Sequence, residues 1–145
     1  MNPDQKTETL RTMLKDYAEV NRYMFHPGGK IENPETERRS TCFPHVVILT
    51  NGSQFGEAIE FALGDDDDTG KPHTFEQMME ALNEEIDFGA YLLEEGGNLV
   101  HHWMDYGFKS EEEAWEAHRK ELQGDHLKAE TVRLAWLRRI KEAVA

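Results

Sequence analysis

The fold class expected from the sequence depends mainly on one segment, FPHVVILTNGSQFGEAIEFAL at residues 43–63. Residues 43–50 form a short apolar run that includes β-branched side chains, which favour a strand. Asn51-Gly52 follows directly, and this pair accepts the positive φ angles of a tight hairpin turn. Residues 53–63 then carry apolar side chains at alternate positions, which is the period of a strand, although Glu57 interrupts the face. The alternating residues are Phe55, Ile59, Phe61 and Leu63. The segment therefore predicts a β-hairpin, and a helix over 53–63 is the competing interpretation.

A second hairpin is expected further along the chain. Residues 90–93 and 99–106 are read as two strands, joined by a turn around Gly96-Gly97. Gly89 is expected to end the helix that precedes the first of them.

Helices are expected around these hairpins. Apolar residues recur at helical spacing over residues 4–24. Thr74 and Gln77 have the spacing of a capping box, and the same spacing recurs at Ser110 and Glu113, so a helix should begin after each pair.

A final helix is expected over about 126–143, after a stop at Gly124. The element order is then αββαββαα. The fold class is α+β, with a four-stranded antiparallel sheet made from two hairpins and helices packed on one face. We expect a single domain over 1–145, with a loop at 26–42 and an acidic loop at 64–73.

Composition indicates the compartment. Cys42 is the only cysteine, so an intramolecular disulfide is excluded, which fits a reducing environment. Residues 1–10 are polar and lack the apolar region of a secretory signal. No apolar run approaches the ~20 residues that a membrane span needs. The expected location is the cytoplasm.

The charge distribution carries the main functional signal. The chain has a net charge of −13, but residues 51–118 alone hold eighteen acids and two bases, which gives −16. Such a segment repels a phosphate backbone, so direct binding of nucleic acid by this segment is not expected. The C-terminal residues 119–145 are weakly basic and are interpreted as a solvated helix face.

Fixed carboxylates on a rigid surface can imitate phosphates to a protein that binds phosphates through Lys and Arg. The sequence therefore predicts a small non-enzymatic binding protein without a cofactor. It would be an inhibitor or regulator that docks on a basic surface of a partner protein, for example one that binds nucleic acid, as DNA mimics and other anti-defence proteins of phages and plasmids do. The residues expected to contact the partner, here called the acidic belt, are Asp65, Asp66, Asp67, Asp68, Glu80, Glu84, Glu85, Asp87, Glu94, Glu95, Glu112 and Glu116.

Three other interpretations stay open. The acidity could serve solubility alone. The protein could be a structural or assembly component in which the terminal helices dimerise. It could also be a calcium-binding domain or metal-dependent enzyme that uses the 65–76 loop with His101 and His102.

The calcium interpretation rests on residues that occupy oxygen-ligand and glycine positions of an EF-hand loop, namely Asp65, Asp67, Thr69, Gly70 and Glu76. Pro72 stands against it, because proline cannot donate the backbone hydrogen bond needed at its position. His101 and His102 would face opposite sides of a strand. Cys42 and His45 lie close in sequence, but a spacing of three does not orient a base toward a thiol, so a structural thiol is the preferred interpretation.

Overall fold

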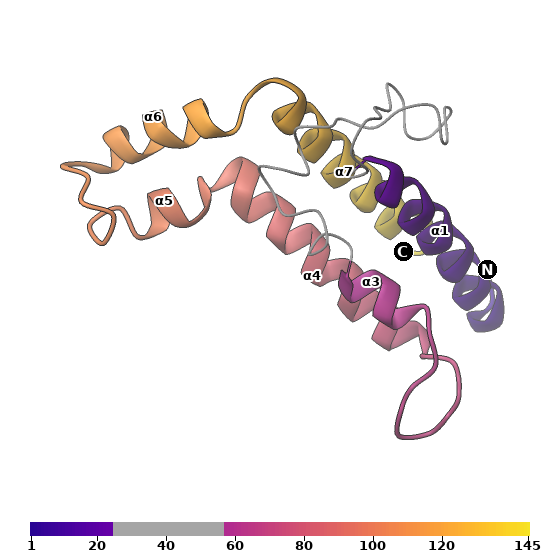
Figure 1. Ribbon diagram of the computed structural model, residues 1–145. Helices are drawn as coiled ribbons and strands as arrows, with labels where there is room; N and C mark the ends of the chain where they lie inside the picture. Colours follow the sequence, from indigo (N-terminus) through magenta and orange to yellow (C-terminus); the bar gives the residue numbers. More distant parts are fainter. Residues whose placement is uncertain (25–56) are drawn as a thin grey trace.

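The computed structural model describes residues 1–24 and 57–145, and these residues form helices joined by turns and loops (Figure 1). Within those two ranges, the one pairing of extended backbone is an isolated antiparallel bridge between Asp65 and Pro72. The expected α+β class with a four-stranded antiparallel sheet is therefore wrong. The described residues belong to a helical fold.

The helices of the described residues are α1 (Pro3–Met24), α3 (Glu57–Ala62), α4 (Phe75–Glu94), α5 (Gly97–His101), α6 (Glu111–Glu121) and α7 (Gly124–Ala143). The three long helices, α1, α4 and α7, make the body of the molecule. α7 packs against both α4 and α1, and α3 packs on α4. α5 and α6 lie against each other and extend away from this bundle as an arm (Figure 1).

The core lies where α1, α3, α4 and α7 meet. Its fully buried side chains come from all four helices and include Leu10, Leu14, Tyr17, Ile59, Met78, Leu82 and Ile140. Full burial of one such aliphatic side chain stabilises the fold by about 1.5–3 kcal/mol. The helix expected over 4–24 is confirmed, and its apolar stripe is the face that enters the core.

The second strand of the first expected hairpin is wrong, because residues 57–62 form helix α3. The competing helical interpretation holds for these residues. Ile59 and Ala62 are buried, whereas Phe61 is 64% exposed. Burial at positions i and i+3 is the pattern of one helix face, and alternation would have placed Ile59 and Phe61 together. Glu and Ala, which dominate this segment, are also strong helix formers.

The first strand of the second expected hairpin is also wrong, because residues 90–93 continue α4. Gly89 does not end the helix but lies buried in its interior. A Cβ atom at Gly89 would stand 3.1 Å from Cδ1 of Leu134. The missing side chain therefore allows α4 and α7 to pack closely, which is a tertiary role that a local rule for helix ends cannot detect.

The expected turn at Gly96-Gly97 is instead the end of α4. Gly96 has φ of +88°, and the N–H of Glu95 still donates to the carbonyl of Ala90. A left-handed glycine after the last helical residues is the usual way to end a helix. Residues 99–106, expected as a strand, form the remainder of α5 and the turns that follow it.

The capping boxes had the predicted outcome at α4. Thr74 accepts from the backbone N–H of Gln77, and the Gln77 side chain accepts from the N–H of Thr74. At α6 Ser110 accepts from the N–H of Glu113, but the Glu113 carboxylate turns to the N–H of Lys109. α6 then ends at Glu121, so Gly124 begins α7 and does not close α6.

The arm is attached to α4 through a buried histidine. The Nε2 atom of His118 lies 2.7 Å from the carbonyl oxygen of Leu92, which places the Nε2 proton between them. Ala114 and Leu122 are buried on the same side of α6. These three residues, spaced four apart, form the buried side of the arm.

Several predictions fall outside the described residues, namely the 43–50 strand, the Asn51-Gly52 turn, the 26–42 loop and the Cys42–His45 pair. Of the helices within the described ranges, none combines the length and the apolar character that crossing a membrane requires.

Candidate functional site

An open groove of about 920 Å³ runs between α3 and α4. Its apolar lining comes from Ala58, Phe61, Ala62, Ala81 and Phe88. Its carboxylates come from Asp66, Asp67, Asp68, Glu80, Glu84 and Glu85. No described lysine or arginine lines it. This α3–α4 groove therefore combines an apolar surface with a strongly negative rim, and it brings together six of the twelve residues of the acidic belt.

The tetra-aspartate loop that forms one end of the groove is an ordered turn built around Asp66. The Asp66 carboxylate accepts from the backbone N–H groups of Asp68 and Thr69 and from the side-chain amide of Gln77. The hydrogen bond from Gln77, followed by the one from the Asp68 backbone, lowers the pKa of Asp66 below its ordinary value. Gln77 therefore joins the start of α4 to the loop.

The carboxylate of Asp66 is occupied by these three hydrogen bonds. The carboxylates of its neighbours are therefore the ones that the loop presents to solvent. Asp65, Asp67 and Asp68 are exposed. Their backbone is fixed on both sides of the turn, since the N–H of Asp66 donates to the carbonyl of Lys71 at 2.7 Å. The loop thus presents carboxylates from a defined backbone geometry.

The other rim of the groove is the exposed edge of α4. Glu76, Glu80, Glu84 and Asp87 are exposed and follow one another at spacings of four, four and three residues. Four residues of α-helix rise about 6 Å, so the carboxylates form a regular row along one side of the helix. Glu80 and Glu84 also line the groove itself. No described side chain pairs with the carboxylates of Glu80, Glu84, Asp67 or Asp68.

Two residues of the acidic belt, Glu94 and Glu85, form ion pairs with arginines of α7. Both carboxylate oxygens of Glu94 accept from the guanidinium of Arg138, at 2.9 and 2.7 Å. These hydrogen bonds lower the pKa of Glu94. Glu85 lies 3.9 Å from the guanidinium of Arg133, and its side chain is only 11% exposed. Both acids connect α4 to α7, so they are poorly placed to meet a partner.

The remaining acids of the belt lie away from the groove. Glu95 is 3.8 Å from Nε2 of His101, close to the end of α4. Glu112 and Glu116 are exposed on α6, where Glu116 is 3.8 Å from Lys120. In Figure 1 the arm lies away from α3 and from the loop between α3 and α4. The acidic belt is therefore divided into a groove cluster and outlying acids, which the sequence alone did not indicate.

The metal-binding interpretation gains no geometric support from the described residues. Within 1–24 and 57–145, no group of three His, Cys, Asp or Glu side chains converges as a metal site would require. His101 lies in α5 and His102 directly after it, not on a strand, and their nearest acids are Glu95 and Asp105. Pro72, the residue that departs from the EF-hand pattern, pairs with Asp65 in the isolated bridge.

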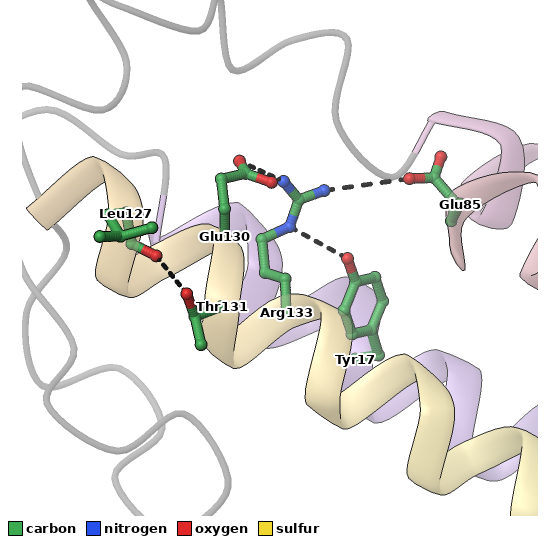
Figure 2. A network of polar contacts seen from close by, with 6 residues as sticks. All are labelled: Tyr17, Glu85, Leu127, Glu130, Thr131 and Arg133. Carbon is green, nitrogen blue, oxygen red and sulfur yellow. Dashed lines mark hydrogen bonds and ion pairs between the residues drawn. The ribbon is translucent and has the colours of Figure 1, made fainter. Parts of the chain in front are cut away.

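A buried polar network was missed by the sequence analysis. Figure 2 shows the guanidinium of Arg133 between Tyr17, Glu130 and Glu85, which come from α1, α7 and α4. Arg133 and Glu130 are 3% and 2% exposed, so a charged pair lies inside the bundle. Burial raises the pKa of Glu130, while Arg133 opposes this effect. This network fixes α4, which carries the acidic row, against α1 and α7.

Phe61 was also missed as a site residue, because it was assigned to the same face as Ile59. A helical reading of residues 57–62 would have found it, since Phe61 then falls off the stripe formed by Ile59 and Ala62. No protein-family model, curated protein or solved structure matches the chain.

Proposed function

We propose that this protein is a non-enzymatic inhibitor or regulator that docks on a basic surface of a partner protein through the α3–α4 groove. One observation carries the proposal: Asp67, Asp68, Glu80 and Glu84 surround the same apolar groove, and no described cation neutralises them. Other acids of the described residues, such as Glu94, form ion pairs within the fold, but these four do not.

Such a cluster mainly affects how fast a partner associates with the protein and which partners can bind. Each exposed ion pair across an interface stabilises it by only about 0.2–1 kcal/mol. A concentrated negative field, however, attracts a positive surface and can raise the association rate by about 10–1000-fold at low salt. The same field repels nucleic acid and acidic proteins. A basic protein surface is therefore the partner that fits the charge.

A partner that binds nucleic acid fits best among basic proteins. Its Lys and Arg side chains are arranged to meet a row of phosphates, and the α4 row offers carboxylates about every 6 Å on a rigid helix. A protein that occupies such a surface would compete with nucleic acid, which is how anti-defence DNA mimics of phages and plasmids act. We place this activity in the cytoplasm, since a chain with Cys42 as its only cysteine fits a reducing compartment.

The test compares two charge-reversal variants that differ only in position. Glu80→Lys/Glu84→Lys reverses a pair at i, i+4 beside the groove, and Glu112→Lys/Glu116→Lys reverses an equivalent pair on the arm. The tagged proteins are used to capture partners from a lysate of the producing cells, and the captured protein is then purified for affinity measurements.

We expect the groove variant to lose the captured protein and the arm variant to retain it. Affinity of the unchanged protein should fall steeply between about 0.05 and 0.5 M salt, because screening shortens the range of the field. Nucleic acid should displace the protein from its partner. Equal binding by the two variants, or binding that is indifferent to salt, would contradict the proposal.

A further inference from the structure

The α3–α4 groove is lined by an exposed aromatic ring as well as by carboxylates. Phe61 is 64% exposed, and its ring centroid lies 5.2 Å from that of His73. We infer that the element which docks here is a basic amphipathic helix of the partner protein, seated along α4 with its apolar face on Phe61. This inference rests on the proposed function and specifies the partner of the same site.

The ring of Phe61 is held in place before any partner arrives. His73 is 6% exposed, and its Nδ1 atom lies 2.7 Å from the carbonyl oxygen of Gly64, which fixes the imidazole. The carbonyl of His73 in turn accepts from the guanidinium of Arg11 at 3.3 Å, which connects this support to α1. A ring supported in this way loses little conformational freedom when it is covered, so it suits an anchoring contact.

The floor beside Phe61 allows the backbone of another helix to approach. Ala58, Ala62 and Ala81 line it, and each ends at Cβ. Two helices pack with their axes 8–10 Å apart when the side chains between them are small or interdigitate. Along α4 the groove extends from Gln77 to Phe88, which is about 16 Å of helix and matches about three turns of a helical partner.

The two rims determine the charge that the partner helix must carry. Glu80 and Glu84 stand one turn apart on the α4 side, and Asp67 and Asp68 close the loop end. A helix with Lys or Arg at positions i and i+4 repeats at the same interval of about 6 Å. Such a helix would face Glu80 and Glu84 with its basic residues and Phe61 with its apolar stripe. This is the pattern of a basic amphipathic helix.

An extended peptide is disfavoured because the described residues offer no sheet edge beside the groove. Extended peptides bind largely by adding a strand to exposed backbone N–H and C=O groups. In the described residues near the groove, α3 and α4 satisfy their own backbone groups, and the isolated bridge at Asp65 and Pro72 is too short to act as a template. A helix brings its own hydrogen bonds and needs only side-chain contacts.

The test uses a synthetic probe, a fluorescein-labelled peptide of leucine and lysine about 18 residues long, with its leucines on one helical face. A control peptide has the same composition in an order that spreads the leucines around the helix. Binding to the whole protein is measured by fluorescence anisotropy at about 0.15 M salt. We expect the amphipathic peptide to bind at least about tenfold more tightly than the control peptide.

Three variants separate the apolar and the charged contributions. Phe61→Ser should weaken binding of the amphipathic peptide by about 10–100-fold, since it removes the aromatic side chain that the bound peptide would cover, and should leave binding of the control peptide nearly unchanged. Glu80→Lys/Glu84→Lys should weaken both peptides. Tyr106→Ser, which changes an apolar residue that is 55% exposed on the arm, should affect neither.

The outcomes distinguish the inference from the proposed function. If both peptides bind equally and Phe61→Ser changes nothing while charge reversal still weakens binding, the helix inference is overturned and the charge-based function stands. If charge reversal has no effect on either peptide, the proposed function fails as well. Unchanged melting temperatures of Phe61→Ser and Tyr106→Ser confirm that the differences arise at the surface.

Discussion

The Nε atom of Arg133 donates a hydrogen bond of 3.1 Å to the hydroxyl oxygen of Tyr17, across 116 residues of sequence and between α7 and α1. Burial raises the pKa of Tyr17 to about 12, so the phenol stays protonated at neutral pH. Its hydroxyl is therefore an acceptor for the guanidinium, and Glu130 and Glu85 supply the negative charge.

This arrangement predicts unequal effects of two substitutions. Arg133→Ala should lower the free energy of unfolding by about 3–5 kcal/mol, because it leaves the buried carboxyl group of Glu130 without its partner. Tyr17→Phe removes one hydrogen bond and keeps the ring packed, so the free energy of unfolding should fall by only about 1–2 kcal/mol. Urea denaturation measures both changes.

The exposed ion pair between Arg138 and Glu94 provides the control for this comparison. Arg138 and Glu94 side chains are 46% and 52% exposed, so Arg138→Ala should change the free energy of unfolding by about 1 kcal/mol or less. A loss at Arg138 as large as that at Arg133 would contradict the view that burial determines the difference.

Gly96 gives a second prediction, about the junction between α4 and the arm. Its φ is +88°, and a Cβ atom there would lie 2.3 Å from Cγ2 of Val100. Gly96→Ala should therefore combine the backbone penalty of a left-handed residue, about 1–2 kcal/mol, with a steric clash inside α5. We expect a clearly lower melting temperature.

Gly107→Ala is the matched control, because Gly107 has φ of +81° and no atom within 4 Å of the added Cβ. It should carry the backbone penalty alone. If the two variants melt at the same temperature, the close contact between Gly96 and Val100 has no energetic weight.

The sequence could predict those parts of the fold whose cause lies within a few residues along the chain. Helix starts at Thr74 and Ser110 were predictable, because a cap depends on residues three positions apart. Gly89 was wrongly predicted to end a helix. The residue that requires a glycine there is Leu134, which packs against it from 45 positions later in the chain. The helix over residues 57–62 is too short for periodicity to distinguish it from a strand. The nearby Asn51-Gly52 pair, which is typical of hairpin turns, then favoured the strand over the helix.

The candidate site was predictable in composition but not in arrangement. Net charge identified the acidic residues, since counting needs no structure. Whether an acid faces a partner or a neighbouring helix depends on long-range packing, which sends Glu85 toward Arg133 and leaves Glu84 at the groove. Phe61 required knowledge of the α3 helix before it could be separated from the core.

Asp66 gives a third prediction, which concerns pH. Its pKa is lower in the folded protein than in an unfolded chain, where an aspartate titrates near about 3.9. The ionised carboxylate therefore stabilises the fold at neutral pH, and this contribution is lost as the pH falls through the folded-state pKa. Asp66→Asn should lower the melting temperature at pH 7, and the difference from the unchanged protein should shrink under acid.

The cause of the shift can be tested separately with Gln77→Glu. Glutamate at this position can still accept from the N–H of Thr74, which preserves the capping box, but it can no longer donate to Asp66. The pKa of Asp66, followed through its carboxyl carbon by NMR, should rise. Asp105→Asn on the arm is the control and should leave that titration in place. An unmoved Asp66 titration in Gln77→Glu would show that Gln77 is not the cause.

The last prediction concerns salt and the stability of the whole chain. A net charge of −13, with −16 between residues 51 and 118, opposes compaction through self-repulsion. At about 0.01 M salt the Debye length is about 30 Å, so carboxylates on α4 and its loop repel across their full spacing, whereas at about 0.5 M they barely interact. Exposed pairs such as Arg138–Glu94 lose some attraction on the same change, but an exposed pair contributes little to stability. Repulsion among many acids should outweigh that loss, so the melting temperature should rise with sodium chloride.

Glu80→Gln/Glu84→Gln removes two charges from the row and should raise the melting temperature at low salt while reducing the response to added salt. A melting temperature that falls as salt is added would mean that attraction within the ion pairs, not repulsion in the acidic row, dominates the electrostatics of the fold.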